Sequence, residues 1–183
     1  MKKLILLLSI LWIAVSAFAN EPLSRDTVIS VPEKSASQIY DGLKKWFITN
    51  AKFDSRYIIE QDDKESKHMV GKIAFSHRVS NITWAAGSGY ITVVIDVMAR
   101  DGRFKLRLSD FNHKSDNPKY SSHWSLGTIT EELPEEWAKG FTTKQWRETY
   151  KRVRTRCDEI INTIFNTVGE YCKEFNPIEE DDW

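Results

Sequence analysis

Residues 95–108, IDVMARDGRFKLRL, decide the fold, and they lie at the centre of a β-hairpin expected over 89–111. Asp101-Gly102 stands between two runs in which apolar and polar side chains alternate. This dipeptide favours a two-residue type I′ turn, because both of its residues tolerate a positive φ. The turn sets the pairing of the strands, and a slip of one residue would bury Lys105 and Arg107.

The pairing predicts two different faces for the hairpin, because successive side chains of a strand point to opposite sides. One face is apolar and carries Ala99 with Phe104, Val97 with Leu106, and Ile95 with Leu108. The other face is mixed and carries Met98 with Lys105, Asp96 with Arg107 as an ion pair, Val94 with Ser109, and Thr92 with Phe111. Two strands alone are marginally stable, so we expect further strands beside the hairpin and helices on its apolar face.

The remaining periodicities predict the order of the other elements. A short strand over 26–31 precedes a helix that carries apolar residues at helical spacing, and strands over 56–61 and 68–76 follow. A long amphipathic helix begins at Thr143. Helices that bracket an antiparallel run of strands pack together on one face of the sheet, so the expected fold is a two-layer α+β domain.

The first residues resemble a secretory signal peptide. Lys2 and Lys3 precede an apolar run over 4–15 and an A-x-A cleavage site at 17–19. The run is shorter than the ~20 residues that span a bilayer, which makes an uncleaved anchor the minor alternative. No Cys follows it, so we expect Sec export to the periplasm or the exterior, not a lipoprotein, with no stable membrane insertion after cleavage. The domain boundaries are then 1–19 for the signal peptide, 20–175 for a single domain, and 176–183 for an acidic tail.

Charge and cysteines narrow the possible partners. The chain has 26 basic and 26 acidic residues, so it has no overall field that would attract nucleic acid, and we expect no nucleic-acid partner. Cys157 and Cys172 both lie in the last predicted helix, about 22 Å apart at ~1.5 Å rise per residue. That separation is too large for a disulfide, so both should be buried thiols, with pairing between molecules as the alternative.

Three short motifs, in this order, resemble a known family. They are Lys45-Trp46-Phe47 late in the first helix, Val70-Gly71-Lys72 in a strand, and Tyr90–Val97 followed by Asp101-Gly102-Arg103-Phe104. Together they resemble the secreted domain of unknown function with a TBP-like (TATA-box-binding-protein-like) fold found in Bacteroides-type bacteria. The resemblance covers roughly 27–111 and, more loosely, the last helix. It implies a curved antiparallel sheet of about five strands in β-α-β-β-β-β-α order, with two helices packed on one face, and it implies no activity.

Residues 112–142 show no convincing periodicity and predict a long loop. The loop is rich in aromatic residues, which suggests that it packs on the domain or binds a partner. We expect a non-catalytic module that binds a protein, peptide or glycan of the cell envelope. The candidate contacts come from this loop and from the helix-free sheet face: Tyr120, Trp124, Trp137, His113, His123, Lys105 and Arg107.

Two other functions stay open at this point. The first is a small hydrolase that uses His113 or His123 with a loop carboxylate such as Asp116, although no nucleophile and base can be paired from the sequence. The second is a small-molecule or lipid carrier with a pocket between sheet and helices. The spacing of the four histidines predicts no metal site, and no motif predicts a cofactor.

Overall fold

The computed structural model describes residues 21–50, 57–79, 87–116, 121–136 and 140–176. The strands are β1 (Arg25–Ser30), β2 (Tyr57–Asp63), β3 (His68–His77), β4 (Gly89–Arg100), β5 (Arg103–Ser115) and β6 (Gly127–Thr128). The helices are α2 (Ala36–Asn50), the short α3 (Ser121–Trp124) and α4 (Thr143–Glu174). The expected signal peptide and residues 177–183 of the expected acidic tail lie outside the described residues.

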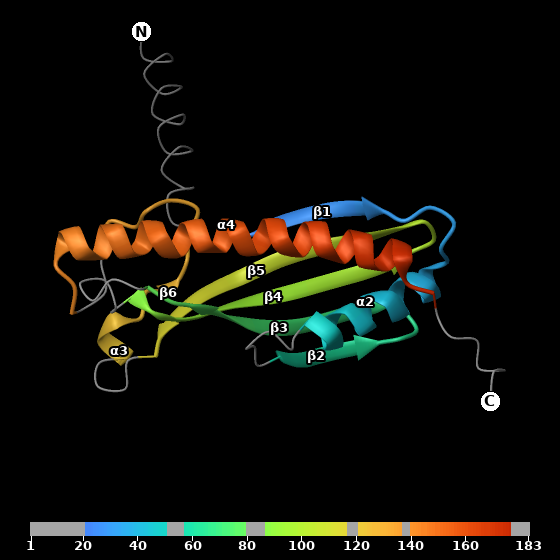
Figure 1. The fold of residues 1–183 in the computed structure, drawn as a ribbon, viewed down its shortest axis with the longest axis horizontal. Coiled ribbons are helices and arrows are strands. Elements are labelled where there is room, and N and C mark those ends of the chain that lie inside the picture. Colours follow the sequence, from blue (N-terminus) through green and yellow to red (C-terminus); the bar gives the residue numbers. More distant parts are fainter. Residues whose placement is uncertain (1–20, 51–56, 80–86, 117–120, 137–139, 177–183) are drawn as a thin grey trace, which may run out of the picture.

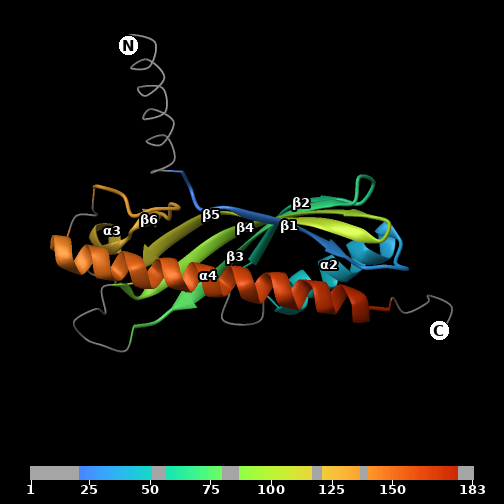
Figure 2. The same ribbon diagram turned by 90° about the horizontal axis from the view of Figure 1, so that it is seen from above.

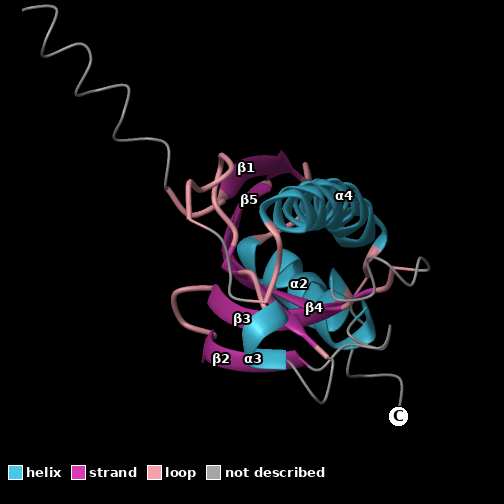
Figure 3. Ribbon diagram, turned by 90° about the vertical axis from the view of Figure 1, so that its left-hand side faces the viewer, coloured by secondary structure: helices cyan, strands magenta, loops and turns pink. Residues whose placement is uncertain are grey.

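The strands form a single antiparallel sheet in the order β1-β5-β4-β3-β2, with β6 also paired to β5. α4 runs along the length of the sheet, and α2 lies beside its C-terminal half (Figures 1 and 2). Seen along the long axis, the sheet curves around the side that holds both helices (Figure 3). The predicted two-layer α+β domain, with two helices on one sheet face, is confirmed.

The hairpin pairs as predicted. Val97 lies opposite Leu106, and the six side chains of the predicted apolar face are at most 4% exposed. The turn type is different, because Gly102 (φ 71°) has a positive φ and Asp101 does not. Tertiary hydrogen bonds hold this turn, since the Asp101 carboxylate accepts the Ala36 N–H (2.7 Å) and Gly102 N–H donates to the Lys34 carbonyl (2.9 Å).

A β-bulge at Asp110 changes the second half of β5. Asp110 has a φ of 57°, and the register shifts there, so Thr92 pairs with Asn112 and not with Phe111 as predicted. The bulge turns Phe111 into the core, where it is fully buried. β5 then continues to Ser115, so the prediction of one long loop over 112–142 is wrong, and α3 and β6 also fall within that stretch.

The packing of the two helices on the sheet depends on small residues at the contacts. A Cβ at Gly71 of β3 would lie 2.3 Å from the ring of Phe47 on α2, so only glycine leaves room for that ring. A Cβ at Gly42 of α2 would lie 3.2 Å from the ring of Phe175, just beyond α4. This glycine therefore allows α2 to pack closely against the residue that follows α4.

α4 begins and packs as the sequence predicts. Thr142 and Gln145 form a capping box at its first turn, which satisfies backbone N–H groups that the helix leaves unpaired. Its apolar stripe is buried along the whole helix, and Cys157 and Cys172 lie within it as free thiols. Burial raises the pKa of both thiols to about 12. Within the described ranges, no helix combines the length and apolar character needed to cross a bilayer.

Candidate functional site

The sheet surface opposite α2 and α4, called the open face here, carries side chains that the core does not use. Val28, Lys105 and Met98 lie side by side across β1, β5 and β4. Val28 is 60% exposed and Met98 is 41% exposed, which is unusual for large apolar residues of a sheet. The hairpin register therefore places Lys105, a predicted site residue, between two exposed apolar side chains.

Arginines on the open face lack acidic partners. Arg100 and Arg103 lie directly opposite each other beside the hairpin turn, and Arg107 lies on the same face four residue pairs further along. Lys105 Nζ contacts Asp26 Oδ2 at 3.4 Å. Among the residues that the structure describes, Arg100, Arg103 and Arg107 make no ion pair.

The predicted ion pair between Asp96 and Arg107 is wrong, although their backbones do pair. The Asp96 carboxylate instead contacts His68 Nε2 of β3 at 2.8 Å. Arg107 is exposed and makes no ion pair among the described residues, although Asp96 of β4 and Asp26 of β1 lie opposite it in the sheet. The open face thus has an excess of positive charge, whereas the formal net charge of the whole chain is zero.

The aromatic residues of 112–142 do not form a described binding surface. Trp124 of α3 is half-buried and its ring lies 6.5 Å from that of Phe141. A Cβ at Gly140 would come within 2.8 Å of the Trp124 indole, so the segment before α4 packs closely against this side chain. Tyr120 and Trp137 lie outside the described residues.

His113 is a core residue and not a surface residue of a loop. It is fully buried on β5, where Nδ1 accepts the Leu126 N–H (3.2 Å) and Nε2 lies 3.0 Å from the Gly87 carbonyl. Burial, together with the nearby His77, lowers the pKa of His113 to about 4. A neutral His113 therefore connects three segments of the chain, with Nε2–H donating to Gly87.

The pairing of His113 or His123 with Asp116, which the hydrolase hypothesis requires, does not form among the described residues. His113 is enclosed in the core, whereas His123 is exposed on α3. Asp116 forms an ion pair with Arg78 of the segment after β3. The centre of the layer between the sheet and the helices is occupied by one cluster of buried apolar side chains, which gives no support to an enclosed lipid pocket there.

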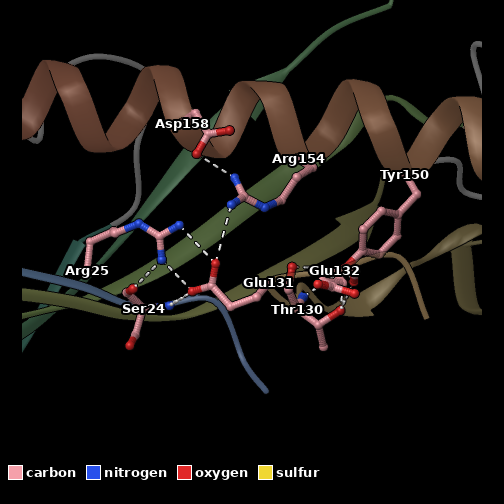
Figure 4. Close-up of polar contacts among 8 residues, drawn as sticks. All are labelled: Ser24, Arg25, Thr130, Glu131, Glu132, Tyr150, Arg154 and Asp158. Carbon is pink, nitrogen blue, oxygen red and sulfur yellow. Dashed lines mark hydrogen bonds and ion pairs between the residues drawn. The ribbon is translucent and has the colours of Figure 1, made fainter. Parts of the chain in front are cut away.

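A polar cluster fastens the N-terminal segment to α4 (Figure 4). Glu131 accepts two hydrogen bonds from the Arg25 guanidinium, one of them at 2.8 Å, and lies 3.6 Å from Arg154 Nη2 of α4. The Arg25 hydrogen bond holds the pKa of Glu131 below its usual value. Arg154 also pairs with Asp158 one turn further along the helix. These contacts give Arg154 a structural role.

Next to this cluster, the Tyr150 hydroxyl of α4 accepts a hydrogen bond from the Thr130 N–H (2.7 Å). Leu23 N–H donates to the Ile129 carbonyl (2.8 Å), which pairs the same N-terminal segment with residues after β6. The charges of this region are thus matched within the protein. It differs in this respect from the open face.

The comparisons with known proteins agree with this fold. Residues 26–114 match the family model described as a domain of unknown function (DUF4468) with TBP-like fold. The chain is similar to a TBP-like protein from Parabacteroides distasonis, with 11% identity and a TM-score of 0.60, over 85% of this chain and 95% of that chain. That similarity shows the fold alone.

A DUF4468 family protein from Bacteroides ovatus is 16% identical, with a TM-score of 0.49, over 81% of this chain and 86% of that chain. No curated protein matches the chain. The family resemblance expected from the sequence is confirmed, and it brings no activity with it.

Proposed function

Residues 26–114 match a domain of unknown function (DUF4468) with TBP-like fold, and this description names no activity. We propose from the geometry that the protein is a non-catalytic binding module. Its open face binds an acidic segment of a partner protein. The observation that carries this proposal is the set of three arginines, Arg100, Arg103 and Arg107, that make no ion pair among the described residues and lie on the sheet face that no described helix covers. The expected signal peptide puts the partner in the cell envelope or outside the cell.

The arrangement of like charges supports a function in binding. Arg100 and Arg103 are directly opposite across two strands, and such a like-charge pair destabilises a sheet. The fold gains nothing from this pair, whereas an acidic partner would make charge-assisted hydrogen bonds to both guanidinium groups. Positive charge on one face also steers an acidic partner to it and raises the association rate.

The apolar neighbours make a protein or peptide the better partner. Val28 and Met98 flank Lys105 and offer apolar contact area in the middle of the charged row. Arginine and methionine are both enriched in protein–protein interfaces. A neutral glycan would leave the arginines unsatisfied, so the charge pattern argues against it.

The test uses a glutamate-rich peptide, with a glutamine-rich peptide of equal length for comparison. Fluorescence anisotropy should show binding of the acidic peptide that weakens as salt is added, because screening reduces such attraction. Arg103→Gln with Arg107→Gln should abolish most of this binding. The matched control is Lys173→Gln, which removes a positive charge on α4, on the helix-covered side.

Two results would contradict the proposal. One is equal binding of the glutamate-rich and glutamine-rich peptides to the unmodified protein. The other is an equal loss of binding in the double arginine variant and in Lys173→Gln. Thermal unfolding of each variant shows whether its fold is intact before binding is compared.

A further inference from the structure

A second positively charged site lies on the helix-covered side of the sheet, where the end of β3 meets the middle of α4. A groove of about 370 Å³ opens there, which we call the β3–α4 groove. Its volume falls within the range of small-molecule sites, roughly 300–1,000 Å³. Its lining residues are Ser76, His77, Arg78, Arg152, Arg156 and Glu159.

Arginines outnumber acidic residues in the lining of this groove. Three of its residues are arginines and one is acidic, namely Glu159, which accepts a hydrogen bond from Arg156 Nη1 at 2.7 Å. Arg152 and Arg156 are one helical turn apart on α4, about 6 Å along the helix axis. The two side chains therefore lie on one face of the helix, next to the groove.

Arg78 is held in place at the edge of the groove. Its guanidinium pairs with Asp116 and lies over the Tyr90 ring, 5.6 Å from the ring centroid. A fixed guanidinium loses less conformational freedom when a ligand binds. The groove therefore combines a preorganised arginine with two arginines of one helix face.

His77 is the least satisfied polar group of the groove. It is 9% exposed, and its Nε2 is buried without a hydrogen-bond partner. Burial lowers the pKa of His77, and Arg156 and Arg152 lower it further, while Glu159 raises it. A buried ring nitrogen without a hydrogen-bond partner is unfavourable. A hydrogen-bond acceptor bound in the groove would give Nε2 such a partner.

We infer that the β3–α4 groove binds a small molecule through an oxyanion, a phosphate or a carboxylate group. Arg152 and Arg156 would bind the oxyanion by charge-assisted hydrogen bonds. A neutral His77 would donate Nε2–H to it after a small rotation of its ring. This site is separate from the arginines of the open face, because its lining residues belong to the end of β3, the residue that follows it, and α4.

NMR titrations of the full domain with inorganic phosphate and with succinate test the inference. One of the two anions should cause saturable shifts at groove residues and raise the pKa of His77, which a bound anion stabilises in its charged form. Saturation with phosphate alone identifies a phosphate ligand, and saturation with succinate alone identifies a carboxylate ligand. If neither anion saturates, or shifts spread over all basic residues, the inference is overturned.

Substitutions locate the binding. Arg156→Gln should weaken binding by about tenfold, the effect of losing one charge-assisted hydrogen bond. Arg152→Gln should do the same, which provides a second variant if the first is poorly folded. Lys173→Gln lies on the same helix about 25 Å away and should bind like the unmodified protein.

If the three variants bind equally, the site is not this groove. The two proposals can fail separately. Arg156→Gln should still bind the glutamate-rich peptide, and the open-face double variant should still bind the small anion.

Discussion

The two faces of the β4–β5 hairpin are built from alternate residues of the same strands, yet one face is apolar and buried and the other is charged and exposed. On the covered face, Phe104, Leu106 and Leu108 are fully buried against the helices. On the open face, Arg103, Lys105 and Arg107 are exposed, and the two arginines have no ion pair within the described residues. The buried face therefore stabilises the fold, whereas the exposed face, where we propose binding, contributes little to stability.

The largest effect should come from the covered face. Phe104→Ala removes a fully buried ring and should lower the free energy of unfolding by about 3–5 kcal/mol, measured by urea denaturation. The control is Arg103→Ala, the preceding residue on the open face, with a change within about 0.5 kcal/mol. Equal losses in the two variants would show that the faces do not differ in this way.

Acid should lower the free energy of unfolding of the protein, because His113 is buried on the covered face in its neutral form. Its pKa is about 4 in the folded protein, against an ordinary value of 6.5, so the unfolded chain binds the proton first as the pH falls. The contribution to stability is therefore complete above pH 6.5 and is lost as the pH falls to 4, by roughly 3 kcal/mol.

Urea denaturation at several pH values measures this loss. His113→Gln should show a shallower pH dependence than the unmodified protein, and His123→Gln, at an exposed site, should show the same dependence. If His113→Gln loses stability in parallel with the unmodified protein between pH 6.5 and 4, His113 is not a buried neutral residue.

An intermediate effect is expected where α2 contacts the sheet. Gly71→Ala places a Cβ 2.3 Å from Phe47 Cζ, and the ring must move, which should cost about 1–3 kcal/mol. Lys72→Ala, one residue further along and on the open face, should change stability by less than about 0.5 kcal/mol. A neutral Gly71→Ala would mean that the ring of Phe47 has another place to pack.

The smallest effect should have the opposite sign. Arg100→Ser removes one member of the like-charge pair with Arg103 and should raise the free energy of unfolding by about 0.2–0.5 kcal/mol. Added salt should reduce this gain, because it screens the repulsion. A loss of stability would show that Arg100 has a structural role, and the arginine row would then be weaker support for binding.

The sequence predicted those parts of the fold in which local pattern and tertiary structure agree. Asp101-Gly102 predicted the pairing of Val97 with Leu106, and the spacing of apolar residues predicted the buried stripe of α4. The bulge at Asp110 was not predictable, because a positive φ at an aspartate leaves no mark in the alternation. After the bulge, the inward side chains His113 and Ser115 are polar, so the continuing strand resembled a loop.

The candidate site was predicted in part. The hairpin register correctly placed Lys105 and Arg107 on the helix-free face. The same register also places Arg100 opposite Arg103 on this face, directly beside the turn. These two arginines could therefore have been predicted as site residues as well. No local pattern could show that Asp96 would bind His68, since that contact depends on how β3 pairs with β4.

The contact between Asp101 and the first turn of α2 bears on how the chain folds. Asp101 belongs to the hairpin turn and also accepts the Ala36 N–H, a donor that the helix itself leaves unpaired. The hairpin can close through contacts near in sequence, whereas the Ala36 N–H at this helix end is bound by a residue 65 positions away. We therefore expect the hairpin to form early in the folding transition state, with the start of α2 consolidating on it afterwards.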